Sequence, residues 1–161
     1  VTCMFLHVDI FHLLCNMYAL YVVGPRAEDF FGKWKFFLIY FISGISGSLL
    51  SIGLKPDALS VGASGAIFGV FGALLYFGYT YRGYIGAMIK SQILPAVLVN
   101  LAITFMYQGI DKGGHIGGLI GGIVVAYALG TIENKKYSLS NIMLLIIYLA
   151  FLIYMVFFRV A

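Results

Sequence analysis

Six apolar stretches of membrane-spanning length restrict what this chain can fold into. A helix needs about 20 mostly apolar residues to cross a bilayer. The stretches that meet this requirement cover residues 5–23, 34–54, 63–81, 84–106, 115–130 and 139–158, the fourth being interrupted by Lys90, Gln92 and Pro95. Short loops separate them, so consecutive stretches should be antiparallel neighbours. The sequence therefore predicts an all-α, polytopic transmembrane helical bundle with six spans, forming a single domain over residues 1–161.

Composition agrees with a membrane location. Apolar residues make up 62% of the chain and charged residues only 10%, against about 25% charged residues in soluble domains. No basic patch interleaved with aromatic residues accompanies the net charge, so we expect the lipid bilayer, and no nucleic acid, as a partner. Cys3 and Cys15 form neither a disulfide framework nor a metal-ligand spacing. Both are interpreted as structural, and no metal or cofactor is predicted.

The basic residues predict the orientation of the spans. Most of them follow the first, third and fifth stretches or lie beside those loops: Arg26, Lys33, Lys35, Arg82, Lys90, Lys135 and Lys136. Fewer follow the second and fourth stretches. Basic loops are retained in the cytoplasm, so the first, third and fifth spans should run from outside to inside. Short loops and a compact core favour a bacterial cell membrane.

Polar residues inside membrane spans are costly and indicate function. His7, His12 and Asn16 lie in the first half of the first stretch, Ser64 begins the third, and His115 begins the fifth. These three stretches all enter from the same side. The polar side chains should therefore converge toward the outer end of the bundle.

The chemistry of these residue types fits a serine hydrolase. A serine hydroxyl needs an adjacent base, and histidine suits that role because its unperturbed pKa is about 6.5. Ser64 opens a helix, where free N–H groups and the positive end of the helix dipole lie. His12 and Asn16 share one helix face and can donate hydrogen bonds to a developing oxyanion. Ser64 and His115 are thus the candidate nucleophile and base.

The sequence also suggests supporting roles for four residues near these candidates. Gly62 and Gly65 have no side chains, so a substrate backbone should be able to approach Ser64 closely. His7 lies about 140° around a helix from His12, so it should face elsewhere and serve as a structural hydrogen-bonding residue. Asp111 is interpreted as a loop residue or helix cap; the alternative is that it orients His115 as the acid of a triad.

In order and spacing, the motifs resemble the rhomboid family of intramembrane serine proteases. The matching patterns are H-x4-H-x3-N at His7, His12 and Asn16, G-x-S-G at Gly62, Ser64 and Gly65, H-x-G-G at His115, Gly117 and Gly118, and G-x3-E at Gly24 and Glu28. The resemblance covers nearly the whole chain. Each motif is weak alone, but their combination on membrane spans is specific.

The resemblance implies roles for individual residues. It implies that Ser64 and His115 form a catalytic dyad without an acid, and that His12 and Asn16 stabilise the oxyanion together with the Ser64 amide. Phe68, one turn after Ser64, falls where the family often has a ring packing on the catalytic histidine.

The same resemblance implies a packing role for two glycines. Gly117 and Gly121 fit the small-xxx-small pattern that lets membrane helices approach closely. In the family this pattern brings the histidine helix against the serine helix.

The resemblance also implies the reaction and its partners. The expected activity is endopeptidase cleavage of transmembrane protein substrates, at small residues in a helix that unwinds easily, near the outer face of the membrane. The family's first core helix and long outer loop have no counterpart here, so we expect the chain to be N-terminally incomplete. The last span corresponds to an added C-terminal helix. The oligomeric state is not indicated.

Other interpretations remain open from the sequence. A catalytically silent rhomboid-like chaperone or retrotranslocation component would have the same fold, although such members usually lack the serine or the histidine. Haem ligation by two histidines would leave Asn16 and Ser64 unexplained. A transporter should show broken helices in matching halves, and none is found. The Gly62–Gly65 segment alone would also fit a packing seam.

Overall fold

The computed structural model describes residues 2–56, 60–81, 83–132 and 138–160, and its regular elements are helices. The α-helices are α1 (Ile10–Phe31), α2 (Lys33–Leu54), α3 (Ser64–Thr80), α4 (Tyr84–Met88), α5 (Leu94–Met106), α6 (Lys112–Leu129) and α7 (Leu139–Met155). A 3₁₀ turn, η1 (Thr2–Phe5), precedes them, and the π-helical segments η2 (Ile89–Ile93) and η3 (Val156–Val160) extend α4 and α7. The predicted all-α bundle is confirmed.

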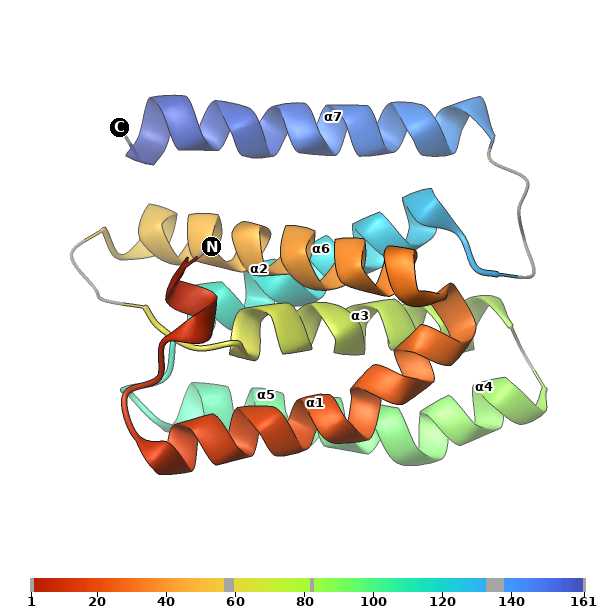
Figure 1. Cartoon of the computed structure of the whole chain (residues 1–161), viewed down its shortest axis with the longest axis horizontal. Coiled ribbons are helices and arrows are strands. Elements are labelled where there is room, and N and C mark those ends of the chain that lie inside the picture. Colours follow the sequence, from red (N-terminus) through yellow and green to blue (C-terminus); the bar gives the residue numbers. More distant parts are fainter. Residues whose placement is uncertain (1, 57–59, 82, 133–137, 161) are drawn as a thin grey trace.

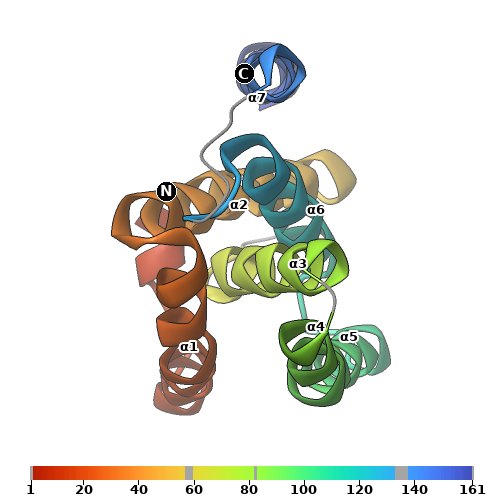
Figure 2. The same cartoon turned by 90° about the vertical axis from the view of Figure 1, so that its right-hand side faces the viewer.

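Helix α3 occupies the centre of the bundle. Figure 2, which looks along the helices, shows α2 and α6 on one side of α3, with α1 and the α4–α5 segment on the other. The most extensive packing joins α2, α3 and α6. Figure 1 shows α7 standing apart, beyond α2 and α6. The bundle thus consists of a tight three-helix centre with looser helices around it.

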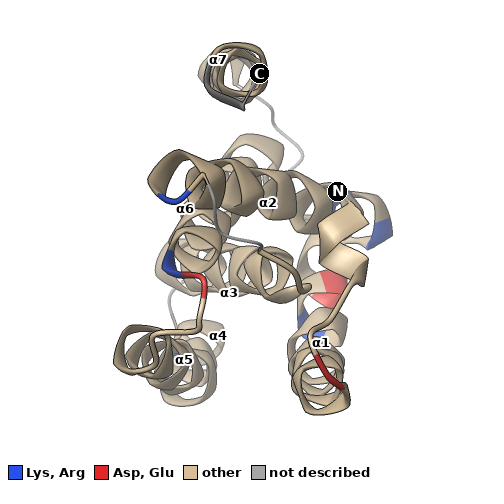
Figure 3. Cartoon of the chain, turned by 90° about the vertical axis from the view of Figure 1, so that its left-hand side faces the viewer, with Lys and Arg blue, Asp and Glu red and all other residues tan. Residues whose placement is uncertain are grey.

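The helices have the lengths and compositions of an integral membrane protein. Among the described residues, Lys33–Leu54, Ile85–Met106, Lys112–Leu129 and Leu139–Phe158 are long and apolar enough to cross a membrane, and Ser64–Thr80 is a shorter apolar helix. Figure 3 shows most of the ribbon in tan, with few charged patches. Helix α1 is long enough but is not in this set, because polar and charged residues along it lower its hydropathy. Two of those residues, His12 and Asn16, line the pocket described below.

Helix α1 differs from its predicted bounds of 5–23. It begins at Ile10 because the Asp9 side chain accepts a hydrogen bond from the His12 N–H at 2.7 Å and caps the helix. It continues through Pro25 to Phe31 and ends at Gly32, whose φ of 79° allows a sharp turn into α2. The apolar run ends near residue 23, but helical hydrogen bonding does not require apolar side chains.

The predicted fourth span is one helical segment with a local change of winding. Pro95 has no N–H to donate to the carbonyl four residues earlier. Immediately before it, Ile89–Ile93 forms a π-helical turn, and the Leu94 N–H donates to the Ile89 carbonyl five residues back. Such wide turns accommodate an interrupted hydrogen-bond ladder within a helix. This segment therefore continues from α4 to α5 despite its proline.

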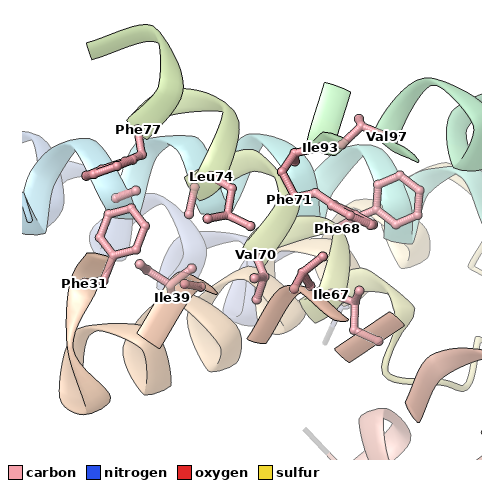
Figure 4. Close-up of a cluster of buried hydrophobic side chains, with 14 of the residues drawn as sticks. Phe31, Ile39, Ile67, Phe68, Val70, Phe71, Leu74, Phe77, Ile93 and Val97 are labelled. Carbon is pink, nitrogen blue, oxygen red and sulfur yellow. The ribbon is translucent and has the colours of Figure 1, made fainter. Parts of the chain in front are cut away.

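The hydrophobic core is built around α3. Figure 4 shows side chains from α1, α2, η2 and α5 meeting a row of α3 side chains. The row consists of Ile67, Phe68, Val70, Phe71, Leu74 and Phe77, all buried. Close packing of this kind replaces the hydrophobic effect as the force between helices in a membrane. It holds α3, and so the serine at its start, firmly in place.

Glycines on two faces of α6 allow both neighbouring helices to approach it. A Cβ atom at Gly118 or Gly122 would collide with the carbonyl oxygens of Gly65 and Gly69 on α3. A Cβ at Gly117 would lie 2.8 Å from the Ser46 carbonyl oxygen on α2. The expectation that Gly117 and Gly121 face the serine helix is therefore wrong: they face α2, and the next glycine pair around the helix faces α3.

Candidate active site

Ser64 and His115 are in direct contact. The Oγ atom of Ser64 lies 2.8 Å from Nε2 of His115, within the range of a nucleophile and its base. Ser64 is the first residue of α3 and His115 the fourth of α6. Because α6 packs closely against α3, the first turns of the two helices bring these side chains together. His115 is only 8% exposed, so little water competes for this contact.

The imidazole of His115 is held on one face and at its second nitrogen. The Phe68 ring stacks on it, with centroids 4.2 Å apart and planes 17° from parallel. Nδ1 lies 2.7 Å from Oγ1 of Thr104 on α5. Sequence reasoning anticipated the ring of Phe68 but missed Thr104. No motif contains that threonine, and only the approach of α5 to α6 brings it to the histidine.

Asp111 does not touch the His115 imidazole nitrogens. Its side chain accepts a hydrogen bond from the Gly114 N–H at 2.9 Å and caps the start of α6. It also accepts a hydrogen bond from the Ser60 hydroxyl. The interpretation of Asp111 as a helix cap is confirmed, and it anchors the segment before α3 to the start of α6.

His12 and Asn16 line the same pocket as Ser64. A Cβ atom at Gly62 would come within 2.7 Å of Cε1 and 2.9 Å of Nε2 of His12. The imidazole therefore rests against the segment that leads into Ser64. Asn16 is 5% exposed, and its Nδ2 donates to the His12 carbonyl at 2.9 Å. One of the two amide hydrogens of Asn16 is used in this bond, which leaves the other for a ligand.

The first turn of α3 has no side-chain cap. Side chains of Asp9, Asp111 and Ser138 cap α1, α6 and α7. The N-cap residue of α3, Ala63, has no side chain that could make such a bond, and α2, α4 and α5 also lack a side-chain cap. The first N–H groups of a helix have no partner within it, and the helix dipole favours negative charge there. The start of α3 is thus a local donor site beside the Ser64 hydroxyl.

A pocket of about 590 Å³ contains all of these groups. Its wall includes Ser64, His115, His12, Asn16 and Thr104, together with residues of η1 and of the segments before α3 and α6. The side chains predicted to converge at one end of the bundle do so. The pocket combines a hydroxyl, an imidazole and several hydrogen-bond donors.

One geometric expectation about this site is wrong, and another stays a prediction. Gly62 and Gly65 both line the pocket, although a Cβ at Gly62 would meet the His12 ring and one at Gly65 would lie 3.1 Å from the Gly114 carbonyl oxygen. That a substrate backbone approaches Ser64 at these glycines therefore stays a prediction. His7 does not face away from His12, because it precedes the helix. The two rings meet edge to face at 5.1 Å. The His7 Nε2 atom is buried without a hydrogen-bond partner in the described part of the chain.

Several known proteins are similar in sequence to this chain. Residues 1–132 match the Rhomboid domain family. The chain is 41% identical to the rhomboid protease GluP of Bacillus subtilis over 92% of its own length and 30% of that protein. It is 36% identical to RHOMBOID-like protein 7 of Arabidopsis thaliana, over 91% of this chain and 52% of that protein. The putative rhomboid protease YdcA of Bacillus subtilis is 31% identical over 85% of this chain and 69% of that protein. The chain thus spans between about a third and two thirds of these relatives, and it belongs to the rhomboid family.

Proposed function

We propose that this protein is an intramembrane serine endopeptidase in which Ser64 is the nucleophile and His115 the general base. The observation that carries the proposal is the 2.8 Å contact between Ser64 Oγ and His115 Nε2 inside a pocket at one end of the bundle. Two of the relatives are described as rhomboid proteases, one of them as putative. A silent chaperone would have no use for this pairing.

The proposed reaction begins with attack on a substrate carbonyl. His115 Nε2 takes the Ser64 proton as Oγ forms a bond to the carbonyl carbon, giving a tetrahedral intermediate. The C–N bond then breaks, and the proton on Nε2 passes to the departing amine. Water attacks the acyl-serine ester, giving up a proton to Nε2. Collapse releases the carboxylic acid and returns the proton to Ser64.

The oxyanion of the tetrahedral intermediate would lie between two groups of donors. On one side are the uncapped N–H groups at the start of α3. On the other side, His12 rests against Gly62, and Asn16 has an amide hydrogen free. Donors aimed at a developing oxyanion contribute about 10²–10³ in rate each. This arrangement supports the assignment of His12 and Asn16 as oxyanion-stabilising residues.

The pocket suits a substrate that comes from the membrane. Phe11 of α1 and Ile103 of α5 line it and are 74% and 42% exposed, so the wall is continuous with apolar surface that faces lipid. A helical peptide uses its own carbonyls in hydrogen bonds, so the segment must unwind before Ser64 can attack. Substrates should therefore be transmembrane segments that unwind readily, and the resemblance to rhomboid proteases implies small residues at the cleavage site.

The decisive test compares the wild-type protein with the Ser64→Ala variant. Full-length protein in detergent is incubated with a transmembrane test substrate and, separately, with a fluorophosphonate probe. We expect the wild-type protein to cleave the substrate and to be labelled. Ser64→Ala should do neither while keeping its helical circular dichroism. Undiminished cleavage by Ser64→Ala would refute the assignment of the nucleophile. A wild-type protein that neither cleaves nor reacts with the probe would favour a non-catalytic role.

A further inference from the structure

The second nitrogen of the His115 ring contacts a residue that the proposed reaction does not use. Thr104 Oγ1 lies 2.7 Å from His115 Nδ1, and Thr104 is only 1% exposed. Thr104 comes from α5, whereas the serine and the histidine come from α3 and α6. A third helix, α5, thus contacts the His115 ring at Nδ1, the nitrogen that does not contact Ser64.

The direction of the hydrogen bonds follows from counting protons. Thr104 Oγ1 also lies 2.7 Å from the backbone carbonyl oxygen of Asn100, which can only accept a hydrogen bond. A hydroxyl has a single proton to donate. If that proton goes to the Asn100 carbonyl, the threonine oxygen must accept from His115, which requires the proton to be on Nδ1. The lone pair of Nε2 then faces the Ser64 hydroxyl.

The opposite arrangement would disable the base. Were Thr104 to donate to Nδ1, Nε2 would carry the proton and could only donate to Ser64 Oγ. In that tautomer Nε2 cannot accept the serine proton. The hydrogen bond from Thr104 to the Asn100 carbonyl would also be lost. The observed pair of 2.7 Å contacts allows both hydrogen bonds at once only when Nδ1 is protonated.

We infer that Thr104 is a positioning residue that fixes His115 in the tautomer with Nδ1 protonated and, with the stacked Phe68 ring, fixes its orientation. This inference rests on the proposed function, because a tautomer matters only if His115 acts as a base. When Nε2 takes the Ser64 proton, the bond from Nδ1–H to Thr104 is already in place. The threonine therefore serves the neutral and the protonated ring without moving.

The kinetic test uses three threonine variants. Thr104→Val keeps the shape but removes the acceptor, so Nδ1–H loses a buried partner. We expect kcat to fall about 10- to 100-fold, as for an unsatisfied buried donor, with KM changed less than twofold. Thr104→Ser should recover most of kcat. Thr80→Val is the matched control, because Thr80 donates to the Tyr76 carbonyl in the same i−4 manner but is exposed and remote from the site.

A structural role alone would give a different pattern. Thr104→Val would then lower the thermal midpoint without a selective loss of kcat, and Thr104→Ser, which has the smaller side chain, would be no better. Either wild-type kcat in Thr104→Val or failure of Thr104→Ser to recover kcat would overturn the inference. The cleavage of substrate by wild-type protein and its loss in Ser64→Ala stand independently of this outcome.

A second readout does not depend on proteolysis. Nitrogen-15 chemical shifts of histidine distinguish a protonated Nδ1 from a protonated Nε2, and the chain has only three histidines. The His115 signals are assigned by their loss in His115→Gln. We expect protonated Nδ1 in wild-type protein at a pH where the ring is neutral, and a shift toward protonated Nε2 in Thr104→Val. Protonated Nε2 in the wild-type protein would overturn the inference even if cleavage were normal.

Discussion

Gly62 shows how one residue can serve both the backbone and the pocket. Its φ of 128° lies in a region that residues with a Cβ avoid, and a Cβ there would lie 2.7 Å from the His12 ring. We expect Gly62→Ala to displace the His12 imidazole from its place beside Ser64. If His12 donates to the oxyanion as proposed, its loss should lower kcat about 10²- to 10³-fold, measured with the transmembrane test substrate.

The backbone strain in that variant has its own control. Gly83 also has a positive φ, of 95°, but no atom lies within 4 Å of a Cβ built there. Both alanine variants should lose about 1–2 kcal/mol of stability from strain alone, whereas only Gly62→Ala should lose activity. Similar losses of kcat in the two variants would mean that strain, and not the position of His12, is responsible.

Single residues differ in how far the sequence reveals them. Ser64, His12 and Asn16 are polar groups in apolar surroundings, so both their presence and their spacing carry information. Thr104 carries no such information, because threonine is common in apolar helices and its partner, His115, lies on another helix. The sequence also could not place His7, because the helical spacing argument assumed a helix that in fact begins only at Ile10.

At the level of elements, the contact between α3 and α6 sets the geometry of the reacting pair. Gly122 lies seven residues after His115, about 10 Å along the helix, and a Cβ there would collide with the Gly69 backbone. Gly122→Ala should force the helices apart and cost about 1–3 kcal/mol. We expect a lower thermal midpoint and slower fluorophosphonate labelling of Ser64, although the substitution touches no pocket residue.

Gly53 provides the matched control for that substitution. It also lies in a membrane helix, but the nearest atom to a Cβ there is Met155 Cε at 3.7 Å. Gly53→Ala should be neutral or stabilising by up to about 1 kcal/mol, because alanine favours the helix. If the probe labels Ser64 as fast in Gly122→Ala as in Gly53→Ala, the close approach of α3 and α6 at Gly122 does not control the distance between Ser64 and His115.

Helix positions were largely predictable, but helix faces were not. The predicted spans 34–54 and 63–81 agree with α2 and α3 to within one residue at each end. Apolar content marks where a chain crosses a membrane. The Gly-Gly-Leu-Ile-Gly-Gly sequence of α6, however, supplies two glycine pairs on adjacent faces, and only packing decides that Gly117 and Gly121 meet α2.

At the scale of the whole molecule, the sequence also does not show where α7 packs on the bundle. Its hydroxyl contact with the bundle is made by Tyr148, 2.6 Å from Ser46 Oγ, and Ser46 in turn donates to the Gly117 carbonyl. An almost wholly apolar helix has no polar face to indicate which side meets protein. The presence of this last helix therefore follows from the sequence, but its place in the bundle does not.

Lys33 and Lys35 lie at the start of α2, and they predict how the bundle sits in the membrane. Lys35 donates to the carbonyls of Gly130 and Thr131 beyond the end of α6, so the start of α2 lies at the end opposite His115. Basic residues at this end should be cytoplasmic, and the pocket should open outward.

Exposed lysines at the two ends allow a direct test of this orientation. In a protein with Cys3 and Cys15 replaced by alanine, Lys33→Cys and Lys112→Cys each place one thiol at an exposed position, at the start of α2 and of α6. A membrane-impermeant maleimide added to intact bacterial cells should label Lys112→Cys, and should label Lys33→Cys only after permeabilisation. The reverse pattern would turn the pocket toward the cytoplasm. The proposed hydrolysis would then draw its water from inside the cell, and the substrates would be cut near their cytoplasmic ends.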